Sequence, residues 1–341
     1  MVQFPKQRSG RIRAVLGLWL CLGMWAAGPA LAEPGPAQVN EIQERQDAAR
    51  GLDLVMDGDL DHAQEIFRQI ELENPQSPLG YLLEADALWW RIYYTTANLV
   101  DPDVFAATDS QNTPYDAHFE DLVNMTILKA ETMRSAGQDV AHSYLYEGMA
   151  YGLKARLAGL RDKDLPTARA GKKMRSYLLK AVQLDPKLTD AYLGIGIYNY
   201  FVDTLSSIVK LLAWLIRLPG GTRAEGLRQL ELVTRQGELS KDDAKFYLAK
   251  DFSRPEERQY TRSMRLFEDI SKEFPHNPLW PMLVGSLHFR IGERTKGEEI
   301  YWQVLKNTAG EKTEVEKAVH QAAHEALQRL HPGENLEKLN L

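Results

Sequence analysis

Cysteine is almost absent from this sequence of 341 residues, in which Cys21 is the single example. One cysteine excludes an intramolecular disulfide and a zinc site built from several thiolates. Strand signatures are nearly absent too, because no sustained alternation of polar and apolar residues occurs. Disulfide-rich scaffolds and β-sandwiches are therefore excluded.

The sequence also lacks the patterns of common catalytic sites: it has no Gly-x-Ser-x-Gly, no phosphate-binding loop and no His-Glu-x-x-His. No two of its scattered carboxylates stand out as a glycosidase pair. His320 and His324 lie four residues apart, and Asp101, Asp103 and Asp109 lie close in sequence, but neither set completes a metal-ligand pattern. We expect no enzymatic activity, no metal and no cofactor.

An excess of basic charge is missing as well: 41 basic residues oppose 47 acidic ones, which gives a net charge of −6. Removal of residues 1–32 would take away four basic residues and no acidic ones, so the remaining chain would carry 37 − 47 = −10. Such a charge disfavours nucleic acid and anionic lipid head groups. We expect no nucleic-acid partner, and we place membrane contact second to a protein partner.

The first 32 residues have the three parts of an export signal. A basic head is followed by an apolar stretch over residues 14–27, and Ala30-Leu31-Ala32 supplies small residues before Glu33. This pattern predicts cleavage near Ala32–Glu33 and a periplasmic or otherwise exported protein. An uncleaved anchor and a lipid-modified Cys21 are the alternatives, although the apolar run is shorter than an ordinary membrane-spanning helix.

What the sequence does contain is helical spacing that repeats about every 34 residues. Pro75, Pro186 and Pro275 stand in the same phase of this pattern, and a new apolar-periodic segment starts three residues after each. A proline ends a helix because it has no N–H to continue the hydrogen-bond ladder. The three prolines therefore predict boundaries between helix pairs.

The first repeat can be followed residue by residue if Glu44 is taken as its first position. Gly51 and Ala63 then occupy positions 8 and 20, where small side chains let two helices approach closely. The bulky residues at positions 11, 24 and 27 fill the space between the helices, and they are Leu54, Phe67 and Ile70. Gly196 and Gly285 take position 8 in later repeats, so we expect both glycines to contact a neighbouring helix.

These residues resemble the tetratricopeptide repeat, and the chain is similar to bacterial exported proteins of this type. The residues over 194–201, the apolar run 208–218 and Pro219-Gly220-Gly221 are also similar to the tetratricopeptide-like family linked to inclusion-body clearance at membranes. The resemblance implies an all-α superhelix of helical hairpins that acts as a scaffold and has no catalytic residues.

The expected organisation has four parts. A linker over residues 33–40 follows the export signal, and a helical repeat domain over 41–308 follows the linker. Two insertions, at about 98–120 and 205–221, interrupt the repeats. Residues 309–341 form a capping helix and tail, because a solenoid needs its last open face covered.

In this repeat type, fixed positions of the first helix of each pair line the concave face. That face is apolar and aromatic here, which predicts a groove for an apolar helix or peptide of a protein partner. The candidate residues are Leu82, Asp86, Trp89, Trp90, Leu145, Met149, Leu193, Ile197, Tyr200, Met282 and Phe289. In one alternative, the chain's own Ile208–Leu218 fills this groove. In another, that segment contacts a bilayer or an apolar ligand, and the protein is a membrane-associated or lipid-handling accessory.

Overall fold

A computed structural model describes residues 36–102, 111–204, 218–310, 312–333 and 336 of the chain. Its contacts divide the chain into Met1–Asn40 and Glu41–Leu341, and nearly all of the described residues belong to the second unit. The expected export signal and parts of both expected insertions, residues 103–110 and 205–217, lie outside the described residues.

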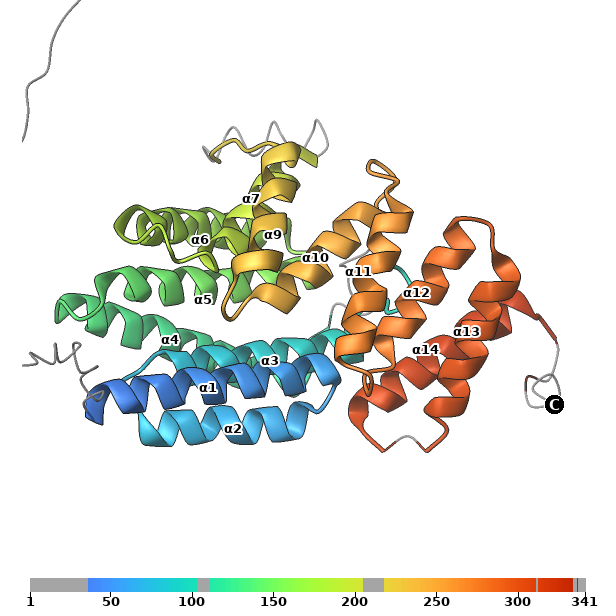
Figure 1. Ribbon diagram of the computed structural model, residues 1–341, viewed down its shortest axis with the longest axis horizontal. Helices are drawn as coiled ribbons and strands as arrows, with labels where there is room; N and C mark the ends of the chain where they lie inside the picture. The colour runs from blue at the N-terminus through green and yellow to red at the C-terminus, as the bar shows by residue number, and fades with distance from the viewer. Residues whose placement is uncertain (1–35, 103–110, 205–217, 311, 334–335, 337–341) are drawn as a thin grey trace, which may run out of the picture. The chain divides into compact units, whose positions relative to one another are not determined.

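All secondary-structure elements of the described residues are α-helices, which confirms the predicted all-α class (Figure 1). The thirteen helices of this part of the chain are α1 Pro36–Asp57, α2 Leu60–Glu73, α3 Leu79–Thr96, α4 Asp116–Ser135, α5 Val140–Leu160, α6 Asp164–Leu184, α7 Ala191–Thr204, α9 Arg223–Gln236, α10 Lys241–Ser253, α11 Tyr260–Glu273, α12 Leu279–Arg290, α13 Arg294–Asn307 and α14 Glu314–Leu330. Helix α1 begins inside the range 33–40 that was expected to be a linker. None of the described helices combines the length and apolar character needed to cross a membrane.

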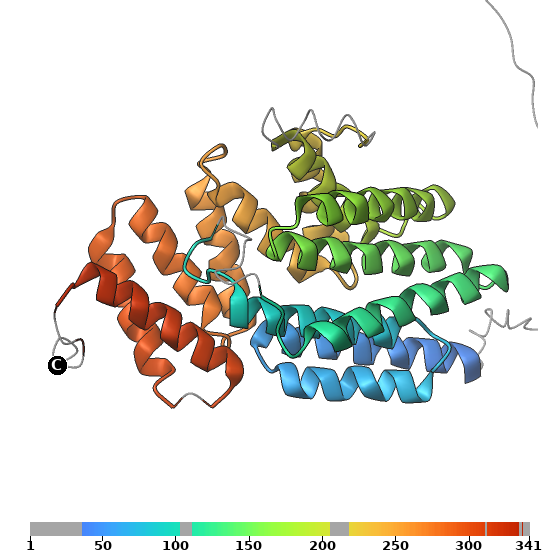
Figure 2. The ribbon, with the colours of Figure 1, turned by 180° about the vertical axis from the view of Figure 1, so that it is seen from behind.

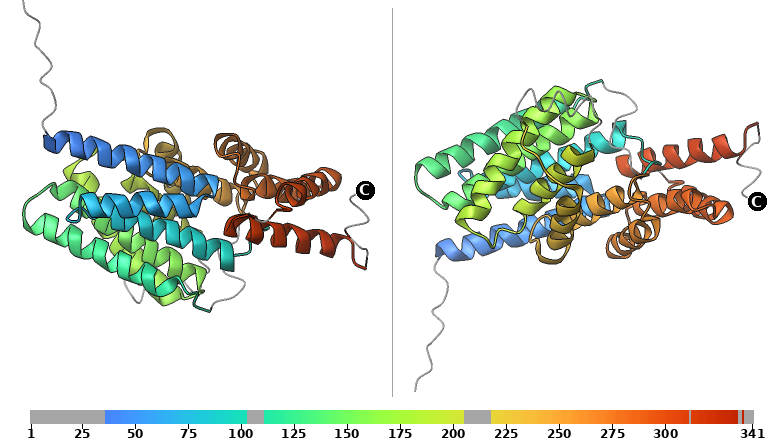
Figure 3. Two further views of the ribbon diagram at one scale, coloured as in Figure 1. Left: turned by 90° about the horizontal axis from the view of Figure 1, so that it is seen from below. Right: turned by 90° about the horizontal axis from the view of Figure 1, so that it is seen from above.

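Helices that follow one another among the described residues pack together as pairs. Helix α5 lies beside α6, α7 beside α9, and α12 beside α13, as the views from several sides show (Figures 2 and 3). Other neighbours along the chain, such as α3 with α4 and α10 with α11, also pack together. The result is a consecutive series of packed helix pairs, consistent with an α-solenoid.

The proline junctions mark helix ends in the structure. Helices α2, α6 and α11 end at Glu73, Leu184 and Glu273, two residues before Pro75, Pro186 and Pro275. The residue that precedes a proline is disfavoured in the α conformation, so the helix stops there. Gly58, between α1 and α2, and Gly292, between α12 and α13, both have φ of +85°, which glycine adopts without strain.

Glycines set the closest approaches between paired helices. A side-chain carbon placed on Gly51 of α1 would lie 2.2 Å from a ring carbon of Phe67, and one on Gly285 would lie 2.8 Å from the Tyr301 ring. On α7, a carbon on Gly196 would lie 3.0 Å from the carbonyl oxygen of Gly226 on α9. The predicted contacts at Gly196 and Gly285 are therefore present.

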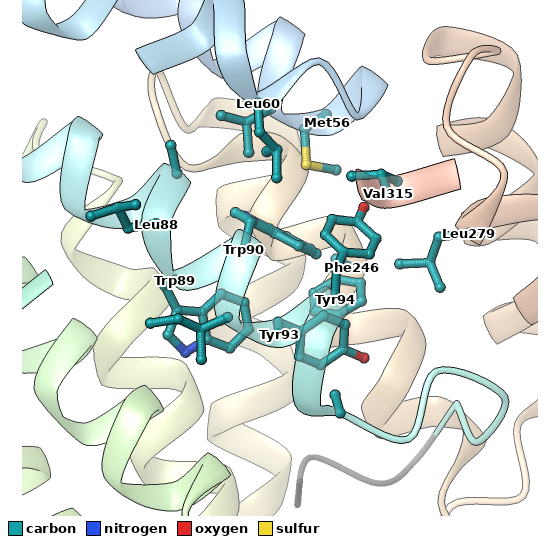
Figure 4. Close-up of a cluster of buried hydrophobic side chains, with 14 of the residues drawn as sticks. Met56, Leu60, Leu88, Trp89, Trp90, Tyr93, Tyr94, Phe246, Leu279 and Val315 are labelled. Carbon is teal, nitrogen blue, oxygen red and sulfur yellow. The ribbon is translucent and has the colours of Figure 1, made fainter. Parts of the chain in front are cut away.

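The main core surrounds α3, which contacts helices that are distant in sequence. The Trp90 ring lies 4.9 Å from Phe246 of α10 and 6.0 Å from Trp280 of α12, measured between ring centroids. Figure 4 shows Phe246, Leu279 and Val315 around the aromatic residues of this helix. Trp90, Trp280 and Phe246 are all almost fully buried.

Polar contacts join the last helices to the first ones. The carbonyl oxygen of Met56, on α1, accepts hydrogen bonds from the Asn277 side chain at 2.8 Å and from the Trp280 indole at 2.9 Å. Arg91 of α3 forms an ion pair with Glu314 of α14 at 2.7 Å. In a simple solenoid each repeat contacts only its neighbours. Here α14 packs on α12 and α13 and also returns to α3.

Candidate functional site

A cavity of about 680 Å³ lies among α1, α3, α5, α6, α7 and α10. Most of the side chains that line it are leucine, isoleucine, valine, methionine and aromatic residues. Cavities of a few hundred to a thousand cubic ångströms with apolar walls and a few polar groups are typical binding sites. This cavity is therefore the candidate functional site.

Six of the eleven residues expected to form the groove line this cavity. They come from the first helices of three pairs, α3, α5 and α7, and they are Leu82, Asp86, Trp89, Met149, Leu193 and Ile197. Leu82 and Trp89 are almost fully buried, whereas Met149, Leu193 and Ile197 are half-buried. Three helices that are far apart in sequence therefore each place one face against the same cavity.

The structure places the other five expected residues elsewhere. Trp90 and Met282 are buried in the core around α3, and Leu145 is buried in a smaller cluster formed with α6 and α7. Tyr200 is fully buried with its ring 5.7 Å from Phe201, and Phe289 is half-buried at 5.2 Å from the Tyr301 ring. Neighbouring residues on a helix point about 100° apart, so Trp89 and Trp90 face different surroundings.

Small residues in the walls keep this space open. Gly152, Ala155 and Gly159 lie three and four residues apart on one face of α5, and Ala168 and Gly171 line the cavity on the neighbouring helix α6. A carbon added to Gly159 or Gly171 would make only an ordinary contact, at 3.7 Å. Larger side chains at these positions would occupy the cavity.

One ionised cluster interrupts the apolar wall. Nη1 of Arg156, on α5, lies 2.6 Å from an oxygen of Asp86, on α3, and 3.4 Å from an oxygen of Asp243, on α10. The same guanidinium stacks on Trp89, 3.6 Å from the ring centroid, and lies 5.3 Å from the Tyr247 ring. Rings in this position stabilise a cation through their negative faces.

Asp243 shares Arg156 with Asp86, and its pKa is raised to about 7. Burial is the largest cause, because it disfavours the charged carboxylate, and the negative charge of Asp86 is the next. Arg156 opposes both effects without cancelling them. The site therefore changes charge near neutral pH.

The other carboxylates in the described lining have different surroundings. Asp190 is buried, and its Oδ1 accepts hydrogen bonds from the backbone N–H groups of residues 238, 239 and 240. It therefore fixes the entry to α10. Asp164 is exposed in the first turn of α6. Asp243 differs from both of them, because it is buried and shares the Arg156 guanidinium with Asp86.

Sequence reasoning did not find Arg156, Asp243 or Tyr247. Arg156 is separated by 70 residues from Asp86 and by 87 from Asp243. No short motif connects them. Arg156 did not stand out in the sequence, because the same helix also carries Glu147 and Lys154 and a solvated side chain would explain any of them equally well.

The remaining candidate groups do not assemble into a second site. Nδ1 of His320 lies 2.9 Å from the Thr308 hydroxyl, and Asp101 forms an ion pair with Arg290. Within the described ranges, no three histidine, cysteine or acidic side chains are placed to hold a metal ion. Asp103 and Asp109 lie outside those ranges.

The expectation that Ile208–Leu218 fills the groove also falls mostly outside the described residues. Leu218 is the described residue of that segment, and its side chain lines the cavity.

No protein-family model matches this sequence, and a search of curated proteins finds no match either.

Proposed function

We propose that this chain is a non-enzymatic scaffold of the tetratricopeptide-repeat type, and that it binds the apolar face of a helix or peptide from a protein partner. The observation that carries the proposal is the apolar cavity to which α3, α5 and α7 contribute groove residues. Under this proposal, the proline junctions and the glycines at position 8 belong to the tetratricopeptide-repeat pattern. Residues 98–120 and 205–221 are insertions into the series of repeats. Residues 1–32 support action after export.

The lining of the cavity suits such a partner. An amphipathic helix presents apolar side chains at every third or fourth position, and a groove with apolar walls removes them from water. Met149 on α5 and Ile197 on α7 are half-buried and offer flexible apolar surface to such a partner. Methionine adapts its shape readily, which suits a site that accepts more than one sequence.

A second candidate function is lipid handling. The specific observation in its favour is the volume of about 680 Å³, which falls within the usual range for small-molecule sites. An alkyl chain would satisfy the apolar walls as well as a peptide would. The experiment below distinguishes the two candidates if it also includes dodecanol, a neutral single-chain probe.

Filling the cavity with a tryptophan at Ala155 should weaken binding of an apolar helix. Ala155 is half-buried on the α5 wall, so the added ring would occupy the space that a ligand needs. The probe is a capped peptide of about 15 residues, long enough to form a helix, with leucine on one face and alanine and glutamine elsewhere. Titration calorimetry should show that Ala155→Trp weakens binding by about tenfold or more, since a blocked pocket loses most buried contacts.

The matched control is Ala117→Trp, which adds the same ring at an exposed position of α4 outside the cavity. Both variants should unfold at temperatures close to that of the wild type. Equal peptide affinity of wild type and Ala155→Trp would contradict the proposal. Binding of dodecanol without binding of the peptide would favour lipid handling instead.

A further inference from the structure

The described charges around the cavity do not balance. Asp86 and Asp243 together carry two negative charges when both are ionised, and Arg156 carries one positive charge. The other charged groups in the described lining, Asp164 and Asp190, are acidic too. A buried charge without a partner is costly, so it either takes up a proton or attracts an opposite charge.

Arg156 is engaged by the protein through one nitrogen and through the face of its guanidinium, whereas its buried Nε and Nη2 have no hydrogen-bond partner among the described residues. Its Nη1 pairs with Asp86 at 2.6 Å, and its guanidinium plane lies over Trp89. Asp243 lies 3.4 Å from the same nitrogen, farther than Asp86, so the positive charge of Arg156 stabilises its ionised form less strongly. Its side chain is 16% exposed and borders the cavity, so a ligand in the cavity has access to it.

We propose that Asp243 is the polar recognition point of the cavity, and that it pairs with a lysine or arginine side chain carried on the apolar helix of the partner. The proposal rests on the proposed function, since it concerns the same cavity. It specifies the partner's chemistry: an apolar face with a basic residue that enters beside Asp243. The net charge of the whole chain, −6, also favours a basic partner.

Several groups face Asp243 and set its protonation. From α3 come Asp86, which disfavours the ionised form, and the Trp90 indole, which favours it. From α5 comes Arg156, which favours it. On α10 itself, Asp242 disfavours ionisation, but it is engaged by Lys245 at 2.7 Å.

The pH dependence follows from these groups. A basic ligand side chain binds the ionised form of Asp243 and competes with a proton. Because the pKa of Asp243 is raised to about 7, the ionised form predominates above neutral pH and is lost as the pH falls below it. Lysine and arginine stay charged throughout this window. Affinity for a basic partner should therefore fall as the pH decreases through 7, and Asp243→Asn should remove that change.

Three capped peptides test the proposal. They share the leucine face of the neutral probe and carry glutamine, lysine or glutamate at the polar positions. At about pH 8, the lysine peptide should bind the wild type about tenfold or more tightly than the glutamine peptide, since a partly buried charge pair contributes at least this much. Asp243→Asn should remove most of that preference, measured as the ratio of the affinities for the lysine and glutamine peptides.

The matched control is Asp269→Asn, which removes one negative charge from the exposed side of α11. It should keep the preference for the lysine peptide, because a distant exposed charge is screened by salt. Thermal unfolding checks that each variant is folded. Asp243→Asn is expected to be at least as stable as the wild type at about pH 8, because it removes one of two neighbouring buried charges.

The outcomes separate the two proposals. If no peptide binds, the proposed function fails, and this inference fails with it. If the glutamine peptide binds and the lysine peptide binds no more tightly, only the role of Asp243 is overturned. A lysine preference that Asp243→Asn leaves intact, or tighter binding of the glutamate peptide, would also overturn it.

Discussion

Replacement of Arg156 by methionine is expected to lower the free energy of unfolding by about 3–5 kcal/mol near pH 8, the range for removing one partner of a buried ion pair. The side chains of Arg156 and Asp86 are only 13% and 12% exposed, so water would compensate little of the lost charge. Asp86 and Asp243 would then repel each other in an apolar wall. Methionine keeps much of the volume of the arginine side chain, so the loss of stability would come from the missing charge and not from a new cavity.

The loss should depend on pH with a definite sign. Without Arg156, the pKa values of Asp86 and Asp243 would be higher in the folded state than in the unfolded chain. The folded state then binds more protons, so stability is greatest at low pH and falls as the pH rises. Urea unfolding followed by circular dichroism should therefore show a smaller loss at about pH 5 than at about pH 8.

Two further variants control this measurement. Arg169→Met changes an exposed arginine on α6 and should have little effect. Adding Asp86→Leu and Asp243→Asn to Arg156→Met should recover much of the stability, because it removes the unpaired charges. A loss that is independent of pH, or that the combined variant does not recover, would contradict this account of the cluster.

Replacement of Trp90 by alanine should cost about 3–5 kcal/mol, as is usual when a large buried aromatic residue is truncated. Trp90 is 1% exposed and touches Phe246 and Trp280, so it joins α3 to both α10 and α12. Its removal would leave a cavity where three helices meet. The measurement is the urea midpoint at neutral pH.

Met149→Ala is the comparison for Trp90→Ala. Met149 is half-buried and faces the existing cavity, so its truncation enlarges a space that is already present and loses fewer contacts. The loss for Met149→Ala should be clearly smaller. Equal losses would contradict the distinction between the core around α3 and the cavity wall.

The helix boundaries could be predicted from the sequence because local residues determine them. Pro75, Pro186 and Pro275 each follow a helix end, and Gly58 and Gly292 occupy turns that require positive φ. The close contact at Gly51 follows from the same reasoning, since no other residue fits against Phe67. These features need no knowledge of distant contacts.

The assembly of the site could be predicted only in part. The repeat register indicated Leu82, Trp89, Met149 and Ile197, and the structure brings these residues together. The repeat register could not show that Trp89 lines the cavity and Trp90 lies in the core, because their surroundings depend on how α10 and α12 pack against α3. The return of α14 to Arg91 and the joining of Arg156 to Asp243 are likewise tertiary contacts without a local sequence signal.

Photo-crosslinking of the neutral peptide tests the central claim, that the cavity binds an apolar partner helix, most directly. One leucine of the peptide is replaced by a diazirine analogue, and crosslinked residues are identified by mass spectrometry after irradiation. We predict crosslinks to the walls formed by α3, α5 and α7, near Leu82, Met149 and Ile197, and their loss in Ala155→Trp. Crosslinks to exposed apolar residues outside the cavity, such as Leu72 and Leu184, that persist in Ala155→Trp would contradict the account.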